Sequence, residues 1–336
     1  MSAIPSSSEA SRSRVGVREV ARAAGVSTQT VSRVINGHPN IRPETRERVR
    51  EAIARLDYRV NNAARALGTR TTRTLGVIAS DAPLYGPSVG IAALDAAARA
   101  AERWIATAYA DAADSASVVG AADRLLAQGV DGIVVLAPHA PTLAALGVAH
   151  PGVPLSVLHG DGEAGLQAAG AGLAVAHLIE LGHRRIGRIA GPDEWLEAAS
   201  RDAGVDRALA EAGAEPGLRW RGDWTAEAAA ALGPEVAAAV RAPGGPTAIV
   251  AANDQMALGL VAGLRAAGLD VPGDVSVAGF DDNPDAAYYT PALTTVRLDL
   301  AGEARRAVAA VLGVESSAPP APPILIARAS TAPPPA

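Results

Sequence analysis

Hydrophobic positions in residues 17–36 recur at helical spacing and predict two short helices joined by a tight turn. The apolar side chains of the first helix share one face: Val17, Val20, Ala21 and Ala24. Gly25 supplies the turn, and Ser27 is a favourable N-cap for the second helix. The second helix turns its own apolar side chains inward: Val31, Val34 and Ile35.

The outward face of the second helix is polar: Thr28, Gln29, Ser32, Arg33 and Asn36. Glutamine and asparagine match adenine edges in a major groove, arginine matches guanine or phosphate, and serine or threonine serves either. We interpret the pair as a DNA-reading helix-turn-helix. A two-helix corner of a larger bundle, with a solvated outer face, is the alternative.

A third helix follows, because Pro43 stands at a helix-start position. Its apolar stripe comprises Val49, Ala52, Ile53 and Leu56. These helices predict a small all-α domain over residues 15–60. The Ser-rich residues 1–14 are expected to be a disordered tail, and residues 61–73 a linker whose short helix orders only when something holds it.

Leu67 lies on the apolar face of that linker helix. A small apolar face on a basic helix suits insertion into a minor groove, where a leucine wedge opens a base step. The alternative is that Leu67 packs on the next domain. Spacing alone leaves both interpretations open.

From residue 75 onward, apolar strand-like runs alternate with Ala-rich helical segments. The expected strands cover residues 75–80, 104–110, 132–138, 155–159, 186–191, 247–253 and 274–282. This alternation predicts parallel sheets with helices on both faces. The runs are enough for one closed barrel, but Pro and Gly breaks near residues 151–172 favour two open sheets. A ligand is then expected beyond the carboxyl ends of the strands, in the cleft between the sheets.

Composition narrows the classes of function. A length of 336 residues predicts two or three packed units, and 49% hydrophobic residues can form large cores. The absence of cysteine excludes disulfides, thiolate metal sites and cysteine nucleophiles. The six histidines lack paired ligand spacing, so we predict neither a metal nor another cofactor. The first 14 residues hold no apolar core of signal-peptide length and no uninterrupted apolar run reaches membrane-spanning length, so the protein is expected in the cytoplasm without a membrane partner.

The net charge of −5 conceals an asymmetry. Residues 1–73 hold 14 arginines against six acidic residues, a balance of +8. The remainder holds 16 arginines against 29 acidic residues, a balance of −13. A basic N-terminal segment followed by an acidic remainder indicates that the N-terminal segment binds a polyanion. A merely solvated basic face is the alternative.

Polar and aromatic side chains follow the predicted strand ends. They include Ser80, Tyr85, Trp195, Arg201, Trp224, Asn253, Asp254, Asp281 and Asp282. Carboxylates, an amide and a guanidinium hold sugar hydroxyls, while indole rings stack on the apolar faces of a sugar. Asp254 and Asp282 alternatively serve only as helix caps.

Two other functional classes share some of these sequence features. The run from Gly86 to Gly90 matches the G-x-S-x-G pattern of hydrolases, but only one predicted strand of its domain precedes it and no histidine follows His183. We therefore predict no enzymatic activity. A secreted sugar-binding protein would share the two-sheet core, but it would carry a signal peptide and no basic head.

Six segments together resemble the lactose/galactose-repressor (LacI/GalR-type) family of transcriptional regulators. In chain order they are GVREVARAAGVSTQTVSRVING, PETRERVREAIARLDY, NNAARALGTRTTRTLGVI, HLIELGHRRIGRIAGP, NDQMALG and SVAGFDDNPDAAYYTPALTTVRLDL. The resemblance covers nearly all of the chain after residue 14. It implies a small all-α helix-turn-helix head and an α/β core, like periplasmic sugar-binding proteins, of two doubly wound parallel-sheet subdomains.

The resemblance also implies domain boundaries. The head covers residues 15–60 and a hinge helix lies in residues 61–73. The first subdomain takes residues 74–171 and 299–321, and the second takes residues 172–298 and 322–331. The chain thus crosses three times between the subdomains, with a late crossover at Pro291 to Leu300 and a returning strand at residues 324–329.

The resemblance implies roles for individual residues. Thr28, Gln29 and Arg33 are placed on the base-reading surface. The resemblance implies that four further residues contact phosphate or support that surface: Ser27, Ser32, Asn36 and Thr45. Asn61 and Leu67 fall where the hinge helix enters the minor groove, which favours the wedge interpretation of Leu67.

In the core, the resemblance implies that Arg201, Asn253 and Asp281 bind sugar hydroxyls. It also implies that Trp224 stacks on the sugar ring. With the strand-end residues Ser80 and Tyr85 and with His159, these form the expected effector site. Two positions depart from the family. His159 stands where sugar-responsive members often carry an acidic residue, and Leu298 stands where a lactose-responsive member has an amide. Both departures argue against a lactose-like effector.

The expected function is that of a repressor released from a pseudo-palindromic DNA operator by a small sugar-type effector. The alternative is a repressor that needs a corepressor such as a purine. The chain ends in STAPPPA without apolar heptads, so a homodimer is the expected state.

Overall fold

The computed structural model describes residues 15–58, 71–80, 84–136, 139–159, 165–214, 217–316 and 318–335. Its contacts divide the chain into a head unit, Met1–Thr72, and a second unit, Arg73–Ala336. The expected tail and most of the expected hinge lie outside the described residues, and so do Asn61 and Leu67.

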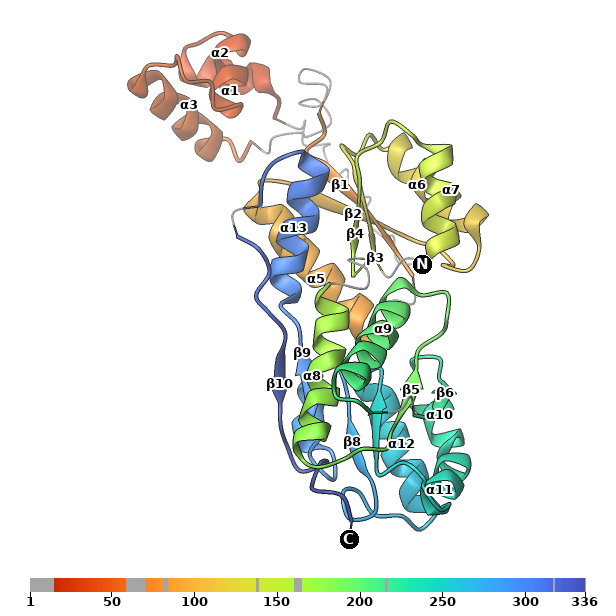
Figure 1. Cartoon of the computed structure of the whole chain (residues 1–336). Coiled ribbons are helices and arrows are strands. Elements are labelled where there is room, and N and C mark those ends of the chain that lie inside the picture. Colours follow the sequence, from red (N-terminus) through yellow and green to blue (C-terminus); the bar gives the residue numbers. More distant parts are fainter. Residues whose placement is uncertain are drawn as a thin grey trace, which may run out of the picture. The chain divides into compact units, whose positions relative to one another are not determined.

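Within residues 15–58 the head unit contains three helices, as the sequence predicts (Figure 1). They are α1 (Val17–Ala24), α2 (Thr28–Ile35) and α3 (Pro43–Arg55). Each contributes a fully buried valine to the common core: Val20, Val31 and Val49. Gly25 closes α1 at a φ of 65°, which a glycine adopts without a steric penalty, and α2 starts three residues later. The tight turn is therefore encoded by this glycine.

The first half of the second unit is built on a four-stranded parallel sheet with the order β2-β1-β3-β4. Its strands are β1 (Thr74–Ala79), β2 (Trp104–Tyr109), β3 (Ile133–Leu136) and β4 (Leu155–Leu158). One face is covered by α6 (Ser115–Ala127) and α7 (Ala140–Ala149), and the other by α5 (Tyr85–Ala100) and α13 (Leu300–Leu312) (Figure 1).

The second half repeats this plan with the order β6-β5-β7-β8, again all parallel. Its strands are β5 (Ile186–Ala190), β6 (Arg219–Arg221), β7 (Ala248–Ala251) and β8 (Ser276–Ala278). The pair α8 (Leu166–Glu180) and α9 (Leu196–Glu211) packs together on one side. The other side carries α10 (Ala226–Ala231), α11 (Gly233–Arg241) and α12 (Asp254–Ala266). Two open sheets, not one barrel, are thus confirmed.

The last elements join the two halves. After β9 (Thr295–Arg297) the chain enters α13, which packs on α5, β3 and β4 of the first half. It then returns as β10 (Ile324–Ile326), antiparallel to β9. The expected returning strand is confirmed in a shorter form. Its partner β9 was expected only as part of a crossover, and β6, α7, α10 and α11 were not expected as separate elements.

A membrane-spanning helix needs about 20 predominantly apolar residues. Of the helices in the described ranges, none meets the length and hydropathy required to cross a bilayer.

Candidate functional site

The carboxyl ends of the two sheets meet at a cleft that holds two adjoining cavities. The first spans about 260 Å³ when the space open to solvent is included, and its lining includes Tyr85, His159 and Gln167. The second spans about 280 Å³ on the same basis, and its lining includes Glu197, Trp224 and Asn253. Both are also lined by Gly86, Arg201 and Asp281. Because they share these residues, we treat the two cavities as one site.

Arg201 is the centre of this site and is fixed on several sides. It lies on α9 and is only 6% exposed. Its Nε donates to Gln167 Oε1 at 2.8 Å, one Nη donates to the Ala252 carbonyl, and the other donates to Asp281 Oδ1 at 3.2 Å. Its guanidinium also lies 4.0 Å from the ring centre of Phe280. A planar, multiply anchored guanidinium presents its remaining N–H groups in fixed directions, as hydroxyl recognition requires.

His159 and Glu197 form a buried ion pair across the cleft. His159 follows β4 in the first half, Glu197 lies on α9 in the second half, and their Nδ1 and Oε2 atoms are 3.0 Å apart. Burial would lower the pKa of His159, but the hydrogen bond and charge of Glu197 outweigh it and raise this pKa. Burial would raise the pKa of Glu197, but the bond from His159 and the charge of Arg201 lower it. The pair is therefore charged at pH values between the two pKa values and holds the two halves together.

Aromatic rings line one wall of the site. Trp195 and Trp224 meet edge to face with ring centres 5.6 Å apart, and Arg201 lies 5.5 Å from the ring centre of Trp224. His139, from the first half, lies 5.0 Å from Trp195 and also forms a β-bridge with it. This is a second contact across the cleft. The wall therefore brings two largely buried indole rings to the cleft.

The backbone is strained where the site is built. His159, Trp224 and Asp281 are not glycines, yet their φ angles are 67°, 74° and 104°. Side chains disfavour this left-handed region, and residues held there concentrate at functional sites. Three of the expected effector residues thus share the left-handed backbone conformation.

Several strand-end residues hold the framework of the site. Asn253 accepts from Met256 N at 2.8 Å as the N-cap of α12 and donates to the Trp224 carbonyl at 3.1 Å. Asp254 accepts from Thr295 Oγ1 at 2.6 Å and from Asn283 N at 2.7 Å. The remaining carboxylate, Asp282, pairs with Arg297 and Arg328, and their hydrogen bonds lower its pKa against the effect of burial. Asn253 is therefore a helix cap as well as a lining residue of the second cavity, while Asp254 and Asp282 tie loops together.

Asp254 predicts how stability depends on pH. Burial, reinforced by the charge of Asp281, raises its pKa from 3.8 to about 8. The folded chain thus holds this proton more tightly than the unfolded chain, so its contribution to stability is lost as pH rises from 3.8 through about 8. We expect the free energy of unfolding of Asp254→Asn, relative to that of the wild type, to rise between about pH 5 and about pH 9. This pH window follows from the linkage between proton binding and stability. Urea unfolding at several pH values measures it, and a constant difference would contradict it.

The structure brings most of the expected effector residues to the cleft. Those that line a cavity are Tyr85, His159, Arg201, Trp224, Asn253 and Asp281. Ser80 is buried just after β1 and belongs to neither lining. Two polar lining residues, Gln167 and Glu197, were not expected. Glu197 stands one helical turn before Arg201, and that spacing is the signal that would have found it.

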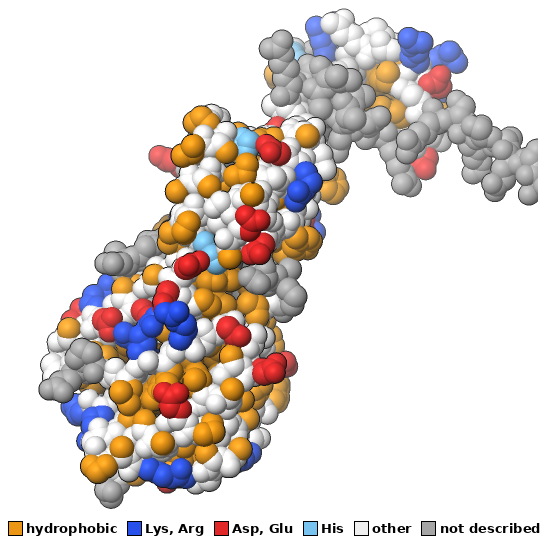
Figure 2. Space-filling view, turned by 90° about the vertical axis from the view of Figure 1, so that its right-hand side faces the viewer, with side chains coloured by type: hydrophobic (Ala, Val, Ile, Leu, Met, Phe, Trp, Pro, Cys, Tyr) orange, Lys and Arg blue, Asp and Glu red, His pale blue; other side chains and the backbone are white. Residues whose placement is uncertain are grey.

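The polar face of α2 is open to solvent in the head unit. Ser27, Thr28, Gln29, Ser32, Arg33 and Asn36 are all exposed, and Thr45 is half-buried. Ser27 caps α2 by accepting from Thr30 N at 3.1 Å. Arginine side chains gather on the surface of the head unit (Figure 2). A rigid helix thus presents hydrogen-bonding groups within a basic surface, as a DNA major groove requires.

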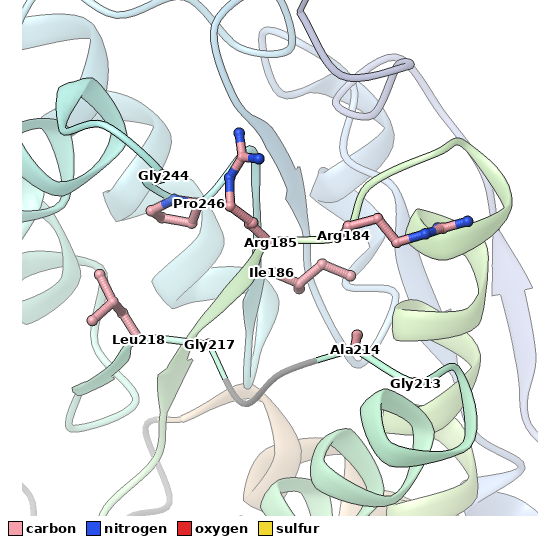
Figure 3. A pocket seen from close by; sticks show the side chains of 9 residues that line it. All are labelled: Arg184, Arg185, Ile186, Gly213, Ala214, Gly217, Leu218, Gly244 and Pro246. Atoms are coloured by element: carbon pink, nitrogen blue, oxygen red, sulfur yellow. The ribbon is translucent and has the colours of Figure 1, made fainter.

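A third cavity, of about 950 Å³, lies where β5, β6 and β7 begin (Figure 3). Its two arginine side chains point in different directions (Figure 3). Arg185 Nε donates to the Gly245 carbonyl at 2.7 Å, and Arg184 donates to the Ile179 carbonyl at 3.0 Å. These charges do not converge on the cavity, and ligands of open parallel sheets bind at the other strand ends. The cleft is therefore the stronger candidate.

The G-x-S-x-G run has a packing role. Residues 86–90 lie inside α5 and do not form a strand-to-helix elbow. A Cβ at Gly90 would lie 2.8 Å from Leu136 Cδ1, so this glycine lets α5 approach the sheet.

As to metals, the ranges that the structure describes contain no group of three or more metal-ligating side chains.

The fold and site define a class: a helix-turn-helix head followed by a periplasmic-binding-protein-like core. Two family models match accordingly. "Bacterial regulatory proteins, lacI family" matches residues 17–61, and "Periplasmic binding protein-like domain" matches residues 175–331.

Known proteins are similar over most of their length. The lactose operon repressor of Escherichia coli (strain K12) is 33% identical over 297 residues, which cover 85% of this chain and 80% of the relative. The regulator CelR of Thermobifida fusca is 34% identical over 305 residues, with 85% and 87% covered. A crystal structure of the lac repressor dimer bound to operator and the anti-inducer ONPF superposes with a TM-score of 0.80 at 30% identity, over 95% of this chain and 100% of that one. The chain belongs to the lacI family of bacterial regulatory proteins.

Proposed function

We propose that the protein is a sequence-specific DNA-binding repressor that a small sugar-type effector releases from its operator. The observation that carries this proposal is that one chain joins an exposed polar helix in a basic head to a two-sheet core with a polar, indole-lined cleft. The relatives support it. One relative is named for the lactose operon. Another is the regulator CelR, whose solved structure as a complex with cellobiose matches 94% of this chain with a TM-score of 0.65 at 30% identity.

The head reads DNA through α2. Gln29 and Arg33 lie one turn apart on its exposed face, so both side chains reach the same stretch of major groove. Thr28 adds a base contact, and Ser27, Ser32, Asn36 and Thr45 contact phosphate or support the surface. A homodimer then reads two half-sites about one DNA turn apart, which makes the operator a pseudo-palindrome.

The cleft senses the effector. Arg201 and Asp281 bind hydroxyls and Trp224 packs on the sugar ring, between halves that His159 and Glu197 also join. A bound effector changes how the two halves meet and thereby the spacing of the two heads in the dimer. Its leverage equals its difference in affinity for the two states, typically about 1–3 kcal/mol.

Substitution of the reading helix tests the function. We expect Gln29→Ala and Arg33→Ala each to weaken binding to the selected palindromic operator about 5- to 150-fold, the equivalent of about 1–3 kcal/mol per base contact. Binding to random DNA falls much less. Fluorescence anisotropy at fixed salt measures both affinities after an operator is selected from a library of palindromic duplexes.

Arg50→Ala is the matched control, because Arg50 is an exposed arginine on α3, away from the reading face. It should leave the preference for operator over random DNA unchanged. Equal losses on operator and random DNA in the α2 variants would contradict the proposed reading surface. Operator binding that tightens when a metabolite is added would instead indicate corepression.

A further inference from the structure

Three buried N–H donors along the cleft have no acceptor within the described part of the chain: His159 Nε2, Gln167 Nε2 and Trp224 Nε1. Each residue is more than nine-tenths buried and lines one of the two cavities. Burying a donor without an acceptor destabilises a folded protein, so native chains rarely retain several together. Three of them in one cleft indicate a ligand rich in acceptor atoms.

The partners of two donors fix their direction. Arg201 Nε can only donate, so the Gln167 atom that lies 2.8 Å from it is the amide oxygen, and the amide nitrogen is left over. The Glu197 carboxylate only accepts, so His159 Nδ1 carries the proton of their 3.0 Å bond. Burial would lower the pKa of His159, but the hydrogen bond and charge of Glu197 raise it, which favours the charged ring, in which Nε2 also donates.

The two cavities differ in charge. Asp281 is the one acidic side chain within the described lining of the first cavity, which His159, Gln167 and Arg201 supply with donors. Burial, opposed by Arg201, raises the pKa of Asp281 to about 6, so this carboxylate is partly neutralised at mildly acidic pH. The second cavity adds Glu197, whose carboxylate accepts from hydroxyl groups. One end of the cleft therefore favours an anionic group and the other favours hydroxyls.

We propose that the effector is a sugar acid whose carboxylate binds in the first cavity and accepts hydrogen bonds from His159 Nε2 and Gln167 Nε2. Its hydroxyls donate to Glu197 and Asp281, and Trp224 Nε1 donates to one of its oxygens. This inference rests on the proposed effector role of the cleft and adds the charge of the ligand. It also accounts for His159, because a histidine attracts the carboxylate that an acidic residue at that position would repel.

Matched acids and neutral sugars test the inference at pH 6.5. The probes are D-gluconate and D-glucuronate against D-glucose, and D-galactonate and D-galacturonate against D-galactose. Calorimetric titration of the full chain gives each Kd. We expect at least one acid to bind about tenfold or more tightly than its neutral partner, because the neutral sugar offers only uncharged acceptors and two hydrogen bonds lose their charge assistance.

Gln167→Glu separates ligand recognition from folding. It keeps an oxygen for Arg201 Nε but replaces the free donor with a carboxylate oxygen, so the acid should lose affinity about tenfold or more while Tm without ligand changes little. Arg185→Ala is the matched control, since Arg185 lines the third cavity and should not affect acid binding.

Four results would overturn the inference: neutral sugars that all bind as tightly as their acids, acid binding that survives Gln167→Glu, acid binding lost in Arg185→Ala, or no binding by any acid of the panel. Operator binding without ligand is measured in parallel. If a neutral sugar releases the operator, the proposed function stands and this inference fails. If no palindromic duplex is preferred over random DNA, the proposed function itself fails.

Discussion

Arg201→Ala should abolish the response to the effector while the protein still binds its operator. Arg201 contacts Gln167, Ala252 and Asp281 and lines both cavities, so its removal destroys the arrangement as well as one contact. Each charge-assisted hydrogen bond contributes about 1.5–3 kcal/mol, so we expect effector affinity to fall by about 100-fold or more. Tryptophan fluorescence measures it, because Trp195 and Trp224 line the second cavity.

The same substitution also leaves Asp281 buried without its cation, which destabilises the second unit. Arg201→Lys separates the two effects. Lysine keeps a positive charge beside Asp281 but cannot reach Gln167, Ala252 and Asp281 in one plane. Folding should therefore be largely retained while effector binding is still lost. Wild-type effector affinity in Arg201→Lys would reject this cleft as the effector site, and lost operator affinity in a folded variant would contradict the separation of the two units' roles.

The architecture follows from local patterns in the sequence. The three helices of the head are marked by helical spacing, by Gly25 and by Pro43, and each signal lies within a few residues of what it determines. The buried strands β1, β3 and β7 are continuous apolar runs, which only a strand covered on both faces requires. Strands β6 and β9 have three residues each, and β6 begins and ends with an exposed arginine. Such short strands exist because a neighbour pairs with them, so their own residues carry little signal.

The site is predicted less completely, for a physical reason. Arg201, Trp224, Asn253 and Asp281 follow or adjoin strand ends, and the topology of parallel sheets brings such residues together. Gln167 lies near the start of α8, immediately after the crossover, and reaches the cleft only because α8 packs along α9. Glu197 acquires its role from His159 in the other half of the unit. Side-chain contacts that form only because the chain passes between the two halves of the second unit cannot be predicted from the spacing of residues in the sequence.

A double-mutant cycle on His159 and Glu197 should show strong coupling. Both side chains are almost fully buried, so removing one leaves the other in a low-dielectric site without a partner. We expect His159→Ala and Glu197→Ala each to cost about 3–5 kcal/mol of unfolding free energy, and the double variant to cost clearly less than the sum. Chemical unfolding followed by tryptophan fluorescence reports on the second unit alone, because all four tryptophans lie after residue 73.

The pH dependence of this coupling has a definite sign. The pKa of His159 is raised from 6.5, so its contribution to stability is full below 6.5 and is lost as pH rises through the higher folded value. The pKa of Glu197 is lowered from 4.5, so its contribution is full above 4.5 and is lost as pH falls through the lower folded value. The coupling energy should therefore be greatest between pH 4.5 and 6.5 and decline on the alkaline side. Additive single-variant losses across this window would show that the two halves of the second unit are held together by other contacts, such as the one between His139 and Trp195.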